Sequence, residues 1–133
     1  MSDLVADTHA AIWYFAKAPE LSVIARTAIN STVSQGGTIF LPTISIVEIV
    51  YLLEKNKLSP ATLPSLMQAM NLPGSSFVPI DLTPGIALAM QQIPRAVVPD
   101  MPDRIIAATA LYMNLPLVTA DHKIQAANIQ WIW

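Results

Sequence analysis

The sequence contains no cysteine among its 133 residues. A disulfide framework, a thiolate zinc site and a cysteine nucleophile are therefore excluded together. Charge is also scarce, because Asp, Glu, Lys and Arg make up only 12% of the chain, whereas about 25% is usual. Much of the surface must consequently be neutral or covered by a partner.

Long apolar runs are missing as well, although 53% of the residues are hydrophobic. A membrane-spanning helix needs about 20 predominantly apolar residues, and the richest run, residues 105–120, is interrupted by polar residues and by Pro116. The N-terminus carries Asp3 and Asp7 and no basic region ahead of an apolar stretch, so it does not resemble a secretory signal. We therefore expect a cytoplasmic protein.

Positive charge is especially scarce, with seven Lys and Arg residues and a net charge of −2. Domains that bind nucleic acid through its phosphates are usually basic. The composition therefore argues against a protein that reads DNA sequence. It argues less against a nuclease, because divalent ions can supply positive charge at the phosphate.

What the chain does contain is a regular alternation of strand and helix patterns. Strands are expected at residues 4–6, 38–41, 77–82, 116–119 and 129–133. Helices are expected at residues 9–18, 23–35, 44–54 and 104–114, and further helices are expected to begin at residue 60, at residue 84 and after residue 121. This alternation predicts a three-layer α/β domain with a mainly parallel sheet and helices on both faces. The length fits one domain, residues 1–133.

Capping residues set the expected helix starts at Ser22, Thr43, Ser59 and Thr83. Their hydroxyls can accept a hydrogen bond from the free N–H groups of a first turn. Proline follows both Ser59 and Thr83, which suits the first helical position. After a proline-rich loop over residues 94–102, Asp103 is expected to open the next helix.

The nine acids are few enough for each position to be informative. Asp7 and Asp121 each follow an expected strand, Asp103 begins a helix, and Glu48 lies inside an apolar helix. In a parallel sheet, ligands bind at the carboxyl ends of the strands, near the switch in strand order. We expect Asp7 and Asp121 to lie at that edge.

A buried carboxylate such as Glu48 needs a compensating cation, because an isolated charge loses too much hydration. Converging carboxylates also repel one another, and a hard divalent ion such as Mg²⁺ or Mn²⁺ resolves that repulsion. Such an ion activates bound water for attack on a phosphodiester. The chain shows neither a Ser/His/Asp order nor a glycine-rich phosphate loop. Metal-assisted hydrolysis is therefore the chemistry that remains.

Four segments together resemble the PIN-domain ribonucleases, and more narrowly the VapC-type toxins of prokaryotic toxin–antitoxin pairs. They are Asp7-Thr8-His9-Ala10, Ser45-Ile46-Val47-Glu48-Ile49, Pro102-Asp103-Arg104, and Leu117-Val118-Thr119-Ala120-Asp121. Each segment is short, but the four occur in order over essentially the whole chain. The resemblance implies a Rossmann-like parallel sheet and an acidic pocket that binds Mg²⁺ or Mn²⁺.

The resemblance also assigns residues to that pocket. The acidic quartet, which would serve as both metal ligands and catalytic groups, is carried over to Asp7, Glu48, Asp103 and Asp121. Three further residues would support the site. Asp100 matches an acidic position outside the ligand set, Thr119 matches a hydroxyl that bonds near the site, and Arg104 is a candidate for a phosphate contact, with a structural salt bridge as the alternative.

Partners follow from the same resemblance. It implies an RNA substrate, a homodimer, and a cognate antitoxin that covers the active site. The low charge and high apolarity independently favour a homodimer, because large exposed apolar patches are uncommon on monomers.

Each acid also has an ordinary structural explanation. Asp is a preferred N-cap residue, and the helix dipole favours acids in a first turn, while Glu48 could pair with a lysine or lie at an exposed rim. Four independent accidents would be needed to reproduce the family pattern, so the metal site is favoured. His9 and His122 are expected to be structural or to face solvent, and residues 13–15 to form core or dimer contacts.

Two other functions compete with the nuclease. The first is a catalytically silent PIN-fold module that binds RNA or protein, which has no reason to retain four converging acids. The second is a phosphotransfer domain. A receiver needs an acidic pair and a phosphatase needs Asp-x-Asp, whereas Thr8 and His9 follow Asp7 here.

Overall fold

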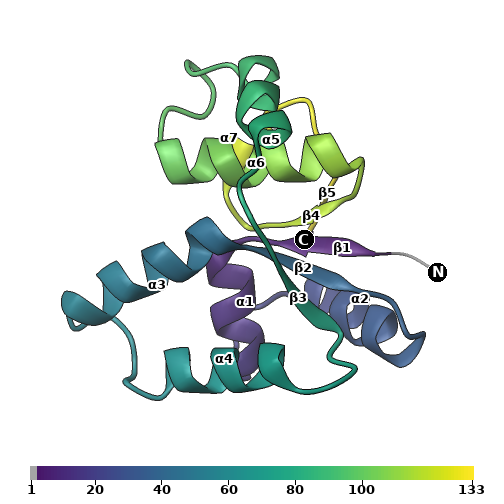
Figure 1. The fold of residues 1–133 in the computed structure, drawn as a ribbon, viewed down its shortest axis with the longest axis vertical. Helices are drawn as coiled ribbons and strands as arrows, with labels where there is room; N and C mark the ends of the chain where they lie inside the picture. Colours follow the sequence, from purple (N-terminus) through teal and green to yellow (C-terminus); the bar gives the residue numbers. More distant parts are fainter. Residues whose placement is uncertain (1–2) are drawn as a thin grey trace.

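A five-stranded parallel sheet runs through the centre of the molecule (Figure 1). The structure is a computed structural model and describes residues 3–133. The strands are β1 (Leu4–Ala6), β2 (Ile39–Pro42), β3 (Phe77–Ile80), β4 (Leu117–Val118) and β5 (Trp131–Ile132). Together with the helices on both faces of this sheet, they confirm the three-layer α/β fold expected from the sequence.

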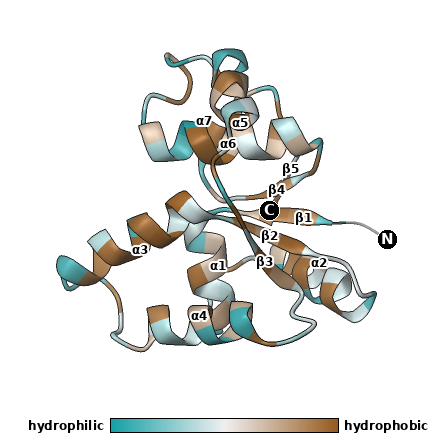
Figure 2. Cartoon of the chain, viewed as in Figure 1, coloured by the Kyte–Doolittle hydropathy of each residue, from teal (hydrophilic) through white to brown (hydrophobic). Residues whose placement is uncertain are grey.

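Helices cover both faces of the sheet, and β1 shows how the faces are divided. Leu4 and Ala6 belong to one core, whereas Val5, which points to the opposite face, belongs to another. The first core contains α1 (Thr8–Phe15), α2 (Val23–Ser34) and α4 (Thr62–Asn71), and the second contains α5 (Pro84–Ala89), α6 (Met101–Met113) and α7 (His122–Gln125). Figure 2 shows apolar residues on the strands and on the helices of both sides.

The strand order β3-β2-β1-β4-β5 places β1 in the middle of the sheet. The chain first builds β2 and β3 on one side of β1 and then crosses to β4 and β5 on the other. The order therefore switches between β1 and β4, which is where parallel α/β sheets bind ligands. Helix α3 (Thr43–Glu54) follows β2 directly and contacts α1 of the first core and α6 of the second.

Two of the four expected caps are present. Ser22 accepts from the N–H of Ala25 at the start of α2, and Thr83 accepts from Ile86 at the start of α5. The other two expectations are wrong. Thr43 is the first residue of α3 itself, because β2 runs directly into the helix and Pro42, which has no hydroxyl, occupies the cap position.

The cap expected at Ser59 fails for a different reason. Ser59 bonds to the N–H of Ala61 within a turn, and α4 begins only at Thr62. The side chain thus stabilises the turn that precedes the helix. Both errors show that a capping residue competes with local turns and with the strand that precedes it.

Helix α6 begins earlier than the sequence indicated. It starts at Met101, and its cap is Asp100, whose carboxylate accepts from the N–H of Asp103 at 3.1 Å. Asp103 therefore lies in the first turn and does not open the helix. Pro102 is compatible with this start, because proline is tolerated in a first turn.

The remaining boundaries differ by a few residues. Helix α1 ends at Phe15, because Lys17 adopts a left-handed conformation with φ of 52° before Pro19 is reached. Strands β3, β4 and β5 are each shorter than expected. No helix in residues 3–133 has the length and apolar character needed to span a membrane.

Candidate metal centre

A pocket of about 450 Å³ opens at the carboxyl ends of β1 and β4, where the strand order switches. Five of the nine acids of the chain line it, together with other residues of α1, α6 and the segment after β4. The lining residues are Asp7, Thr8, His9, Trp13, Glu48, Asp100, Asp103, Ile106, Ala120 and Asp121. The whole expected quartet therefore lies in one pocket, and Asp100 lies there as well.

Asp7 is held between the first strand and the first helix. Its N–H bonds to the carbonyl of Val118 at 3.1 Å, which joins β1 to β4, and its Oδ1 accepts from the N–H of Ala10 at 2.8 Å. The side chain is only 8% exposed. Burial raises the pKa of Asp7, and hydrogen bonds from the Thr119 hydroxyl and the Ala10 N–H offset part of that rise.

Thr119 links Asp7 to Asp121. The fully buried Thr119 hydroxyl bonds to the Asp7 carboxylate and accepts from the N–H of Asp121 at 3.1 Å. Asp121 caps α7, because its Oδ1 accepts from the N–H groups of Lys123 and Ile124 at 2.8 and 3.2 Å. The cap interpretation is therefore correct for both acids, but each cap occupies only one carboxylate oxygen, so capping and metal binding are compatible.

Glu48 is positioned by hydroxyl groups of α1 and α3. The Thr8 hydroxyl donates to Glu48 Oε1 at 2.6 Å, and the buried Ser45 hydroxyl lies 2.9 Å from Thr8 Oγ1. Sequence reasoning assigned no role to Thr8 or Ser45. Their positions gave a weak signal, since Thr8 follows Asp7 directly and Ser45 precedes Glu48 by one helical turn.

Asp103 has the most strongly perturbed environment among the half-buried acids. Burial, the negative charges of Asp100, Asp121 and Glu48, and a hydrogen bond with Asp100 raise the pKa of Asp103 to about 7. Without a cation, the protein therefore disfavours the ionised form of this carboxyl. A positive ion at this position would remove the unfavourable interaction.

Three of the acids lie at the spacing of metal ligands. Glu48, Asp100 and Asp103 each have one carboxylate oxygen within 4.8 Å of the other two. Oxygens on one octahedral Mg²⁺, with bonds of about 2.1 Å, lie about 3.0 Å apart in adjacent positions and about 4.2 Å apart in opposite ones, so the three carboxylates would close in on a shared ion. All three donors are carboxylate oxygens, which suit a hard divalent cation.

The cluster shares Glu48 and Asp103 with the ligand set expected from the sequence, adds Asp100, and does not include Asp7 or Asp121. Asp100 was expected outside the set, but it lies at ligand spacing with Glu48 and Asp103. Asp7 and Asp121 line the same pocket beside this cluster. The spacing of Asp100 had no local signal in the sequence, because it depends on how the start of α6 at Met101 packs against α3.

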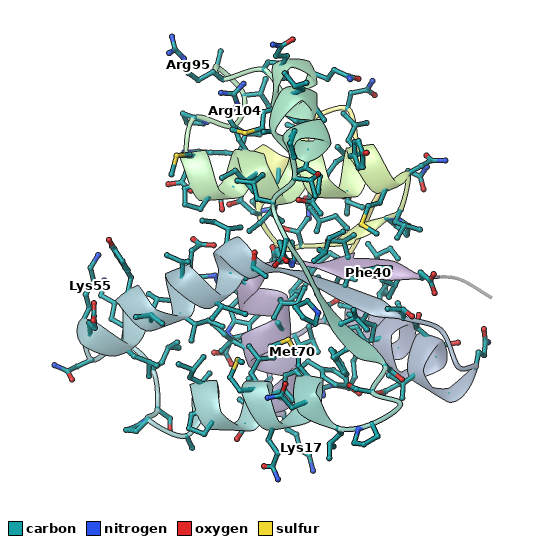
Figure 3. The ribbon with its side chains drawn as sticks, viewed as in Figure 1. Lys17, Phe40, Lys55, Met70, Arg95 and Arg104 are labelled. Carbon is teal, nitrogen blue, oxygen red and sulfur yellow. The ribbon has the colours of Figure 1, made fainter. Side chains whose placement is uncertain are left out.

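Arg104 lies on α6 and is not among the lining residues of the pocket. Its Nη2 donates to the carbonyl oxygens of Met90 and Ile93 at 2.8 and 2.9 Å, and its Nε donates to Ile93 at 3.1 Å (Figure 3). These partners are backbone carbonyls and not the carboxylate that a salt bridge requires. The guanidinium braces the segment before the Asp100 loop, and a phosphate contact stays a prediction.

The aromatic segment of α1 divides between core and pocket. Tyr14 and Phe15 pack against Phe77, with ring centroids 5.5 and 4.8 Å apart, as expected for core residues. Trp13 also packs on the core, but it lines the acidic pocket together with the exposed His9. The expectation of a core or dimer role is thus incomplete for Trp13.

Comparison with known proteins agrees with this architecture. The chain is 28% identical over 126 residues to ribonuclease VapC22 of Mycobacterium tuberculosis, covering 95% of this chain and 92% of that protein. VapBC2 from Rickettsia felis, bound to a promoter DNA fragment, has a similar fold, with a TM-score of 0.72, 16% identity, and coverage of 97% and 96% of the two chains. A toxin–antitoxin complex from Klebsiella pneumoniae gives a TM-score of 0.67, 21% identity, and coverage of 98% and 96%. Residues 4–129 match the PIN domain family, and the chain belongs to that family.

Proposed function

We propose that this protein is a metal-dependent endoribonuclease and the toxin of a toxin–antitoxin pair. The observation that carries the proposal is the convergence of five acids in one pocket at the strand switch of a PIN domain. The similarity to a protein named as a ribonuclease supports RNA as the substrate. A catalytically silent module is the less favoured function, because the repulsion among these acids would then remain although no bound ion or reaction required them.

Mg²⁺ or Mn²⁺ is the ion that suits this donor set. Glu48, Asp100 and Asp103 would hold it, and Asp7 and Asp121 are the remaining acids that would complete the site. When bound, such an ion lowers the pKa of water, orients it for in-line attack, and neutralises charge that develops on the phosphate oxygens. A donor set of carboxylate oxygens in a chain without cysteine disfavours a softer metal.

The protein's own contribution is to fix the carboxylates. The Thr8 hydroxyl holds one oxygen of Glu48, and the Thr119 hydroxyl bonds to Asp7 while it accepts from the N–H of Asp121. These bonds leave other carboxylate oxygens to bind the ion or to accept a proton from water. Partners that hold ligands in this way are worth about 10-fold to 100-fold in metal affinity or activity.

An antitoxin and a second copy of the chain are the proposed protein partners. The fold resembles that of a protein in a toxin–antitoxin complex, which supports the first. Exposed apolar side chains support the second, because they indicate a surface that a partner covers. Val47 and Tyr51, one turn apart on α3, are 50% and 61% exposed. Light scattering of the purified chain, alone and with its antitoxin, would test both partners.

Cleavage of a structured RNA pool tests the proposed function. Wild-type protein with Mg²⁺ or Mn²⁺ should cut the RNA, whereas wild-type protein in EDTA and the Asp103→Asn variant with metal should not. Identical RNA patterns in all these reactions would favour the silent module. Circular dichroism of the variant provides the control that the fold is intact.

A further inference from the structure

Two ring side chains share the pocket with the acids. His9 and Trp13 lie four residues apart on α1, so they occupy the same face of the helix one turn apart. Their ring centroids are 5.4 Å apart and the planes are tilted by 50°. Trp13 is in turn 5.9 Å from Trp133, at a tilt of 56°. The three rings therefore form one series of contacts that reaches the pocket wall.

Burial changes along this series. Trp133 and Trp13 are half-buried and pack on the hydrophobic core, whereas His9 is exposed. The two tryptophans are thus held by packing, and they support a histidine ring that is open to solvent. A ring that is already held in place loses little conformational freedom when a ligand stacks on it, and this favours binding.

The charged residues that line the pocket are acids, so its rings suit the uncharged base of a nucleotide better than the phosphate. No Lys or Arg is among the lining residues, and Figure 3 shows Lys17, Lys55 and Arg95 at the outer edges of the molecule. A bound cation can interact with a phosphate, but it provides nothing for the base beside that phosphate. Every base has a π-face that can stack on a ring, whatever the sequence.

We propose that His9 and Trp13 form a stacking surface for an unpaired RNA base beside the phosphate at the acidic cluster. This proposal rests on the proposed ribonuclease function and names the residues that would position its substrate. Bases within a duplex are covered on both faces by their neighbours, whereas bases in loops and ends can be splayed out onto aromatic side chains. His9 and Trp13 would then position the substrate, and the acids would remain the catalytic groups.

The test compares His9→Ala, His9→Phe and Trp13→Leu with wild-type protein. Binding of a labelled oligoadenylate of about 12 nucleotides and of a blunt duplex is measured by fluorescence anisotropy in Ca²⁺, with strand integrity checked on a gel. Steady-state cleavage of the same oligoadenylate is measured in Mg²⁺ or Mn²⁺. His122→Ala is the matched control, because His122 is also exposed but does not line the pocket.

We expect His9→Ala and Trp13→Leu to weaken oligoadenylate binding by about tenfold, the scale of one lost stacking contact. The loss should appear in KM, with kcat nearly unchanged. His9→Phe should restore binding, because it retains a ring without the imidazole nitrogens. The duplex should bind more weakly than the oligoadenylate, and His122→Ala should behave as wild type.

The outcomes separate this proposal from the proposed function. If wild type cleaves the strand and both His9→Ala and Trp13→Leu cleave it with an unchanged KM, stacking is overturned and the nuclease stands. Equal losses in His9→Ala and His9→Phe also overturn stacking, since a ring would then not suffice. If the strand binds in the expected variant order but wild type never cleaves it with metal, the stacking surface stands and the nuclease is overturned. Failure of wild type to bind the oligoadenylate overturns the stacking surface.

Discussion

The acids of the pocket divide into two groups that are held in different ways. Asp7 and Asp121 follow strands, and backbone N–H groups and the Thr119 hydroxyl bond to them. Glu48 lies in α3, whereas Asp100 and Asp103 lie at the start of α6, and the three have oxygens within 4.8 Å of one another. The strand group is thus fixed by bonds from the backbone, whereas the helix group contains three carboxylates that repel one another and that a cation would draw together.

The largest expected effect comes from breaking the helix group. Asp103→Asn removes one ligand of the cluster and should lower kcat/KM for RNA by at least about a hundredfold, because the ion contributes several kcal/mol to the transition state. The same variant should melt a few degrees higher than wild type in EDTA, because its neighbours no longer repel a charge at this position. Loss of folding would instead make Asp103 structural.

A second change loosens the helix group without removing a carboxylate. Thr8→Val deletes the hydroxyl that donates to Glu48 and should weaken Mn²⁺ binding by about tenfold. Isothermal titration calorimetry would measure this affinity directly. Thr27→Val, a matched change at an exposed position of α2, is the control and should leave the affinity unchanged.

A third pair of changes tests the strand group. Asp121→Ala should lower the free energy of unfolding by about 1 kcal/mol, because α7 loses its cap, whereas Asp121→Asn should keep most of that stability. Both variants should lose cleavage if the carboxylate serves the ion. Equal destabilisation of the two variants in urea unfolding would contradict the capping role.

The smallest expected effect is a dependence of metal-free stability on pH. The pKa of Asp103 is raised to about 7 in the folded protein, whereas it lies near 4 in an unfolded chain. The folded state therefore binds more protons between these values, and stability should fall as pH rises from about 4 to 7 and then level off. We expect a decrease of a few degrees in Tm in EDTA, smaller in Asp103→Asn and reversed by Mg²⁺. A flat profile in EDTA would show that Asp103 stays ionised.

The same division explains what the sequence could predict. Asp7 and Asp121 were placed correctly at this edge because Asp7 follows β1 directly and Asp121 comes shortly after β4, and parallel strands end at the same edge. Glu48 was found because a lone acid in an apolar helix is conspicuous. Asp100 was placed outside the ligands from the family resemblance alone, and its spacing with Glu48 and Asp103 depends on the observed start of α6 at Met101.

Contacts between distant segments gave no comparable signal. Thr8 and Glu48 are 40 positions apart in the chain, and their bond depends on how α1 packs against α3. The series from His9 through Trp13 to Trp133 spans nearly the whole sequence and likewise requires the folded structure. Local propensity also failed at Thr43, where the preceding strand dictates how the helix starts.

The brace made by Arg104 has a consequence for mutagenesis. Its three bonds tie α6 to the carbonyls of Met90 and Ile93, just before the loop that delivers Asp100. Lysine cannot reproduce this forked geometry, although it keeps the charge. A genetic screen for variants that no longer inhibit cell growth should therefore recover substitutions of Arg104 as well as substitutions of the acids. Metal titration would separate the two classes, since a displaced Asp100 weakens the affinity for the ion whereas a missing carboxylate removes a ligand outright.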